Sequence, residues 1–217
     1  MNSTEIVSQI KSIIQKQFEN ESTGHDWFHI ERVYNMATFL QKSEGGNLEI
    51  IELAALLHDV SDHKFNGGSA TLGGDIAFEM LINLNYSSVK AEKVREIINQ
   101  VSFKGANVEH LTSSIEAKIV QDADRLDAIG AIGIARAFAY GGNKGRPLYD
   151  PSIPPVLHDS FDAYKNAKSH TINHFHEKLL LLRRKLNTRT AINIGNERHE
   201  FLELFLKNFM NEWNFSQ

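Results

Sequence analysis

The chain has 217 residues, of which 41% are hydrophobic and 23% are charged, and its formal net charge is −4. This length and composition are typical of one folded domain, which we expect to span residues 1–217. The slight acidic excess argues against a surface for duplex nucleic acid. The absence of cysteine excludes disulfides, thiolate zinc sites and cysteine nucleophiles. The sequence shows no secretory signal and no apolar run long enough to span a bilayer, so we expect a cytoplasmic protein with no membrane partner.

Helical periodicity dominates the chain, and the alternation typical of strands is scarce. Residues 141–157 carry all four prolines, which predicts a surface loop and a candidate lid. Near the end of the chain, the spacing places Ile172, Phe175, Leu179, Leu182 and Leu186 on one helix face, and Leu202, Phe205, Phe209 and Trp213 on another. The predicted helices cover residues 3–20, 26–43, 47–59, 69–85, 88–102, 113–128, 130–140, 170–186 and 188–215.

The pair His58-Asp59 follows the apolar run 50–57. This run is hydrophobic on nearly every side of a helix, which predicts a buried element. A carboxylate at the end of such a helix costs free energy unless something pairs with it. A divalent cation would satisfy Asp59, and the neutral imidazole of His58 would supply a second ligand. The pair alone is a weak signal, because a second His-Asp pair at residues 158–159 is interpreted as a coincidence.

Two further segments strengthen this interpretation. His29 lies on the second turn of an amphipathic segment, and residues 122–127 place three aspartates in an apolar helix. The order His, His-Asp, Asp resembles the signature of the HD-domain metal-dependent phosphohydrolases. The strings DADRLDAIGAIGIAR at 122–136 and HFHEKLLLL at 174–182 are similar to the bacterial YpgQ/YedJ-type branch of that family. The similarity covers almost the whole chain.

This resemblance implies an all-α fold. We expect an HD-domain helical bundle whose metal core covers residues 20–130, followed by the proline-rich loop and by an additional C-terminal helical layer at residues 158–216.

The resemblance also implies a metal site formed by His29, His58, Asp59 and Asp124. The choice of Asp124 over Asp122 follows the family pattern, and helical spacing agrees with it. Two imidazoles and two carboxylates suit Mn²⁺, Fe²⁺, Co²⁺ or Ni²⁺, and they are compatible with Mg²⁺ or Zn²⁺. The resemblance favours Mn²⁺. We expect one ion per chain, because the helix at 88–102 contains no histidine that could bind a second ion.

A metal-activated water is the expected nucleophile, since the chain has no cysteine and no Ser-His-Asp arrangement. Asp62 lies four residues after His58, and we interpret it as the candidate general base. The alternative is that Asp62 only ends the helix in a polar loop, with His63 as a weaker candidate. Asp127 is a second catalytic candidate that would orient a ligand or a water. Its alternative role is an ion pair with Arg136 or Arg125.

Substrate phosphates require cations near the metal motifs. Arg32 lies one turn after His29, Lys64 follows the His-Asp segment, and Lys104 ends the helix expected to cover the site. Arg146 of the proline-rich loop is a candidate contact to a base or sugar. His174 and His176 do not predict a second metal, because residues two apart on a helix point to different faces.

The resemblance implies hydrolysis of a (deoxy)nucleoside triphosphate to a monophosphate and pyrophosphate. A 5′-nucleotidase acting on monophosphates remains an alternative, as does a non-catalytic sensor that binds a metal or a nucleotide. The expected partner is a small-molecule nucleotide. A homodimer is compatible with the sequence, but nothing in the sequence shows one.

Overall fold

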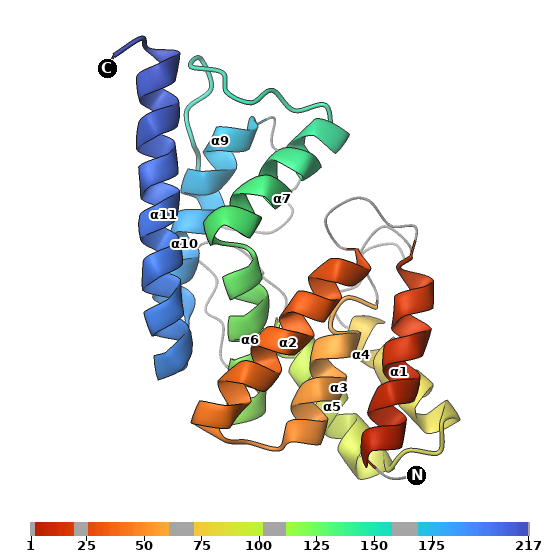
Figure 1. The fold of residues 1–217 in the computed structure, drawn as a ribbon. Helices are drawn as coiled ribbons and strands as arrows, with labels where there is room; N and C mark the ends of the chain where they lie inside the picture. Colours follow the sequence, from red (N-terminus) through yellow and green to blue (C-terminus); the bar gives the residue numbers. More distant parts are fainter. Residues whose placement is uncertain (1–2, 20–25, 61–71, 102–111, 158–168, 217) are drawn as a thin grey trace. The chain divides into compact units, whose positions relative to one another are not determined.

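The computed structural model describes residues 3–19, 26–60, 72–101, 112–157 and 169–216. Within these ranges the secondary structure is helical and contains no strand (Figure 1). None of the described helices is long and apolar enough to cross a membrane. The all-α fold predicted from the sequence is confirmed.

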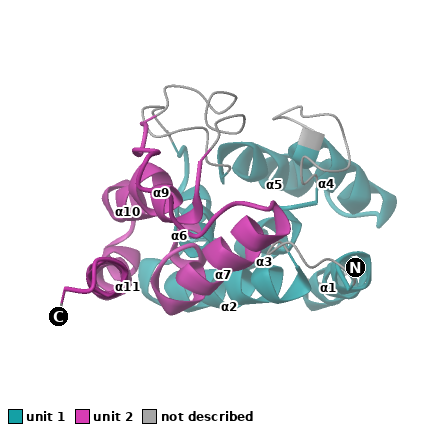
Figure 2. Ribbon diagram, turned by 90° about the horizontal axis from the view of Figure 1, so that it is seen from above, with its two compact units in different colours: residues 1–102, 110–124 teal, residues 103–109, 125–217 magenta. Residues whose placement is uncertain are grey.

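The chain divides into two compact units, coloured teal and magenta in Figure 2. The first unit comprises residues 1–102 and 110–124, and the second comprises residues 103–109 and 125–217. The helix α6 (Ile115–Asp127) contributes residues to both units. That residues 1–217 form a single domain stays a prediction.

The first unit is organised around α3, which the sequence predicts as a buried helix. Its faces pack against α1, α2 and α5, and α4 packs against α5. Asn47 caps α3, its side chain accepting a hydrogen bond from the amide of Ile50. The buried residues of α3 include Leu53, Leu56 and Leu57, and each such side chain stabilises the fold by roughly 1.5–3 kcal/mol. The helices of this unit are α1 (Ser3–Gln17), α2 (Trp27–Glu44), α3 (Leu48–Leu57), α4 (Leu72–Asn83), α5 (Ser88–Val101) and the first part of α6.

The second unit has an aromatic core. Phe175 is fully buried, and its ring stacks on Phe205 with centroids 5.6 Å apart, while Phe138 contacts both rings. The predicted apolar face containing Phe175 is confirmed, because all five of its residues are buried. Trp213 differs from the prediction: it contacts Tyr149 but is 45% exposed. The elements are α7 (Gly130–Asn143), α9 (Thr171–His174), the π-helix η1 (Phe175–Leu179), α10 (Leu180–Leu182), the 3-10 turn η2 (Arg183–Lys185) and α11 (Arg189–Trp213).

The described part of the proline-rich loop is anchored to α9 and η1. The amide of Thr171 donates to the carbonyl of Pro147, and the side chain of Asn173 donates to the carbonyl of Ile153. The amide of Val156 donates to the buried carboxylate of Glu177 at 3.1 Å. These bonds satisfy loop groups that would otherwise lose hydrogen bonds to water on burial. That the loop acts as a lid stays a prediction.

Candidate metal centre

His29 is held in place by the cap of α2. Asp26 precedes the helix in an extended conformation, and its carboxylate accepts a hydrogen bond from the amide of His29 at 2.8 Å. This satisfies one of the amides that have no partner in the first turn of a helix. The backbone of His29 is therefore fixed at the start of α2, and its imidazole lies in the protein interior.

His58 lies at the other end of a buried helix, at the C-cap of α3. Its Nδ1 is 2.8 Å from the carbonyl oxygen of Ala55. A carbonyl oxygen can only accept, so Nδ1 carries the proton of the neutral ring. The lone pair is then on Nε2. The backbone of α3 thus selects the tautomer that can bind a metal.

Three of the predicted ligands, His29, His58 and Asp59, form a cluster in the first unit whose ligand atoms lie within 4.8 Å of one another. The fourth, Asp124, lies beside the two imidazoles. The Nε2 atoms of His29 and His58 are 3.2 Å apart, and the carboxylate of Asp59 lies 3.4 Å from the first and 3.6 Å from the second. Oδ1 of Asp124 lies 3.6 Å from Nε2 of His29 and 3.9 Å from Nε2 of His58. Ligands about 2.1 Å from one ion would lie roughly 3.0–3.4 Å from each other in octahedral or tetrahedral geometry. The donor set and its spacing therefore fit one divalent cation.

The two sides of this cluster differ in exposure. The imidazole side chains of His29 and His58 are 1% and 3% exposed, whereas Asp59 and Asp124 are 20% and 30% exposed. The site is thus closed on the histidine side and reaches solvent on the carboxylate side.

The aspartates of α6 have different surroundings. Asp122 is fully buried, whereas Asp124 faces the two imidazoles, as helical spacing predicts. Asp127 forms an ion pair with Arg136 at 2.9 Å in the second unit. The alternative ion-pair role of Asp127 is therefore present in the structure, and its catalytic role stays a prediction. Arg125 instead donates to the carbonyl of Lys185.

The structure leaves several predicted contacts untested. Asp62, His63, Lys64 and Lys104 lie outside the described residues. Arg32 is a partly buried residue of α2, and Arg146 follows α7 in the second unit. The substrate-binding roles of all these cations stay predictions.

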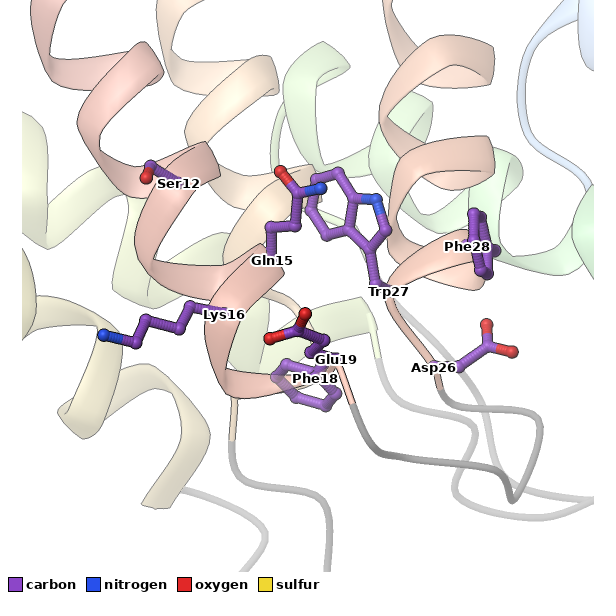
Figure 3. Close-up of a pocket in the computed structure, with 8 residues that line it drawn as sticks. All are labelled: Ser12, Gln15, Lys16, Phe18, Glu19, Asp26, Trp27 and Phe28. Atoms are coloured by element: carbon purple, nitrogen blue, oxygen red, sulfur yellow. The ribbon is translucent and has the colours of Figure 1, made fainter.

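A separate pocket of about 480 Å³ lies between α1 and the start of α2 (Figure 3). Its wall includes Trp27 and Phe28, the two residues that precede His29 in the chain. It contains none of the four metal ligands. Because its lining carries two carboxylates against a single lysine, it is a poor site for phosphate groups. It is lined by Ser12, Gln15, Lys16, Phe18, Glu19, Asp26, Trp27 and Phe28.

His174 and His176 differ in burial, as expected for residues that point to different faces. His176 is exposed and His174 is partly buried. Burial, and after it the positive charges of Lys178, Arg146 and Arg136, lower the pKa of His174 to about 3. His174 is therefore neutral in the folded protein at physiological pH.

This neutral state predicts a pH dependence of stability. Between pH 6.5, the ordinary pKa, and about 3, the unfolded chain binds a proton at His174 that the folded chain does not bind. The contribution of His174 to the free energy of unfolding is therefore present above pH 6.5 and lost as the pH falls. Urea denaturation should show that the stability advantage of wild type over His174→Gln shrinks between pH 7 and pH 5. An advantage that grows over this range would contradict the neutral assignment.

Comparison with known proteins agrees with this site. The HD domain matches residues 27–129, a range that contains all four proposed ligands. The chain is 38% identical to the protein YpgQ of Bacillus subtilis over 200 residues, which cover 92% of this chain and 89% of YpgQ. The chain belongs to the HD-domain family.

Solved structures of HD-domain proteins support the same assignment. An HD-superfamily hydrolase from Bacillus thuringiensis is 41% identical with a TM-score of 0.75, and the match covers 98% of this chain and 99% of that one. The structure of B. subtilis YpgQ in complex with ADP matches with a TM-score of 0.73 and 35% identity, over 95% of this chain and 97% of that one. This HD-domain protein is thus a metal-dependent phosphohydrolase of the YpgQ-type branch.

Proposed function

We propose that the protein hydrolyses (deoxy)nucleoside triphosphates between the α- and β-phosphates and releases pyrophosphate. The observation that carries this proposal is the cluster of His29, His58 and Asp59. The partly exposed carboxylate of Asp124 lies beside its two imidazoles. The ADP complex of YpgQ supports a nucleotide as the substrate class, because that relative is similar along nearly its whole length. The YpgQ-type similarity favours pyrophosphate as the product.

The residues of this site would hold the metal ion through different donor atoms. A divalent cation held by these residues would supply a water of lowered pKa and would polarise a phosphoryl oxygen. His58 contributes its Nε2 lone pair, since Nδ1 donates to Ala55. Asp59 and Asp124 contribute carboxylate oxygens. Two imidazoles and two carboxylates favour a first-row transition metal, and we propose Mn²⁺.

We further propose that Asp62 takes the proton of the attacking water, while Arg32 with Lys64 and Lys104 binds phosphate oxygens. These roles are supported by position in the sequence. Asp62 is four residues after His58, and Arg32 is three residues after His29 on the same helix.

Isotope labelling tests the proposed function directly. The wild-type protein with Mn²⁺ is incubated in ¹⁸O-water with a panel of nucleoside mono-, di- and triphosphates, and the products are separated by chromatography and analysed by mass spectrometry. We expect a monophosphate that carries ¹⁸O and unlabelled pyrophosphate, because attack at the α-phosphorus leaves the new oxygen on the monophosphate. Orthophosphate and free nucleoside, formed from monophosphates with triphosphates untouched, would instead identify a 5′-nucleotidase. No product from any nucleotide, despite bound metal, would identify a sensor.

The role of Asp62 is tested by Asp62→Asn. The variant should retain the metal, because Asp62 is not among the four ligands. Its turnover should fall about 10²–10⁴-fold, which is the usual contribution of a general base. Metal content by elemental analysis and kcat by pyrophosphate release measure the two effects separately. Turnover at the wild-type rate would exclude Asp62 as the base.

A further inference from the structure

Two cationic side chains contact one aromatic ring near the end of α7. The Nζ of Lys144 and the guanidinium carbon of Arg146 each lie 5.7 Å from the centroid of the Tyr140 ring. Among the described residues, neither cation has a carboxylate within ion-pair distance. The ring quadrupole attracts both cations, but it does not neutralise them. Within the described ranges, the pair therefore lacks the counter-charge that usually accompanies two neighbouring cations.

The backbone holds Arg146 in a fixed position relative to α7. Its amide donates to the carbonyl of Gly141 at 2.8 Å, and the amide of Gly145 donates to the carbonyl of Gly142 at 3.1 Å. Gly145 has φ +64°, which is the left-handed conformation that this type of helix end requires. The three features together form a Schellman motif. The base of the Arg146 side chain is thus positioned before any ligand arrives, which lowers the entropy lost on binding.

More positive charge surrounds this position. The charges of Arg136 and Lys178, like that of Arg146, lower the pKa of His174, and Arg136 also forms an ion pair with Asp127. His174 itself stays neutral and adds no charge. The second unit as a whole contains 14 lysines and arginines against 10 aspartates and glutamates, whereas the first unit contains 9 against 17. The positive charge of this acidic protein is therefore concentrated in the second unit.

We propose that Arg146 and Lys144 form a binding site for a phosphate-bearing anion on the second unit. Arg146 would bind phosphate through two parallel N–H···O bonds, and Lys144 would act as a point charge. Because cations cover the Tyr140 ring, we assign the recognition to phosphate rather than to a nucleobase. A free pyrophosphate and the phosphate tail of a nucleotide share this chemistry. The choice of a nucleotide tail rests on the proposed function, whereas the anion site itself does not.

Calorimetric binding of inorganic pyrophosphate, ATP and adenosine tests this site. The titrations use the full chain with chelator present, so that hydrolysis and metal-bridged binding do not contribute, and they are repeated in His58→Ala. The variants are Arg146→Ala and Lys144→Ala, with Lys207→Ala as the matched control because Lys207 is an exposed lysine of α11 in the same unit. Circular dichroism of each variant checks that the fold is retained.

We expect pyrophosphate and ATP to bind, and adenosine not to bind. Arg146→Ala should weaken binding roughly 10- to 100-fold and Lys144→Ala by a smaller factor, while Lys207→Ala leaves binding within about twofold. Equal affinities for pyrophosphate and ATP would identify phosphate alone as the ligand, and a tighter ATP would identify the nucleotide tail. Both results support the site.

Three results would overturn the proposal. One is the absence of pyrophosphate binding in the wild type. Another is an equal loss of pyrophosphate affinity in Arg146→Ala and Lys207→Ala, which would indicate unspecific attraction of the anion to a positive surface. The third is binding that is lost in His58→Ala and unchanged in Arg146→Ala, because this would place the anion at the metal centre. Failure of the proposed hydrolysis would leave these binding results unaffected.

Discussion

Replacement of His58 or Asp59 by alanine should remove bound metal and hydrolysis together. Each residue supplies one of four donors, and the four lie 3.2–3.9 Å from one another in the pairs that involve a histidine. A site with so few protein ligands loses affinity steeply when one is removed, because the remaining donors must hold the ion alone. Loss of a residue that only supports a metal ligand already lowers metal affinity about 10- to 100-fold. Loss of a ligand itself should therefore leave less than about a tenth of the wild-type metal in elemental analysis after dialysis. Nucleotide hydrolysis should fall to the level of chelator-treated wild type.

Asp75→Ala is the matched control for this experiment. Asp75 is also an aspartate of the first unit, but its side chain is 44% exposed and pairs with Arg95. This variant should keep both the metal and the activity. Unchanged metal content in His58→Ala and in Asp59→Ala would contradict the assignment of the site.

Phe175→Ala should strongly lower the free energy of unfolding. The side chain is fully buried, stacks on Phe205 and contacts Phe138. Truncation of a buried phenylalanine leaves a cavity and typically costs about 3–5 kcal/mol of unfolding free energy. Urea denaturation monitored by circular dichroism measures this loss.

The control for Phe175→Ala is Phe201→Ala on α11. Phe201 is 47% exposed, so its truncation should change the unfolding free energy by about 0.5 kcal/mol or less. Equal effects of the two substitutions would show that Phe175 does not anchor the second unit.

Most helices could be predicted from the sequence because their apolar residues recur at helical spacing. The end of α7 is an instructive exception. The pair Gly141-Gly142 predicts a break, and the predicted helix stops at residue 140, but α7 continues to Asn143. A Cβ at Gly141 would collide with the side chain of Thr171, so this glycine permits close packing against α9. A glycine can mark the end of a helix or a place where two helices approach closely, and the sequence looks the same for both. Only the tertiary contact with Thr171 shows that Gly141 is the second kind.

Trp213 shows a second limit of prediction from periodicity. Its spacing from Phe205 and Phe209 places it on the apolar face of α11, yet it is 45% exposed. Periodicity indicates which face of a helix is apolar, but it does not indicate how far along the helix the covering layer extends.

For the candidate site, the order of the motifs predicted that His29, His58 and Asp59 lie close together. It also predicted that Asp124 lies near the two imidazoles. Their orientation depends on backbone groups that no motif identifies. The carbonyl of Ala55 selects the tautomer of His58, and this follows only from the geometry at the end of α3. The cap by Asp26 was not predicted, because the predicted helix includes residue 26. Aspartate is a common N-cap, and this preference could have identified it.

The most direct measurement of the central claim is a metal titration of activity. Protein stripped with chelator receives Mn²⁺ in steps, and pyrophosphate release from a nucleoside triphosphate is recorded at each step. The four-ligand site predicts no hydrolysis without metal and a linear rise that saturates at one equivalent per chain. Hydrolysis by the stripped protein, or no pyrophosphate at saturating metal, would contradict the account.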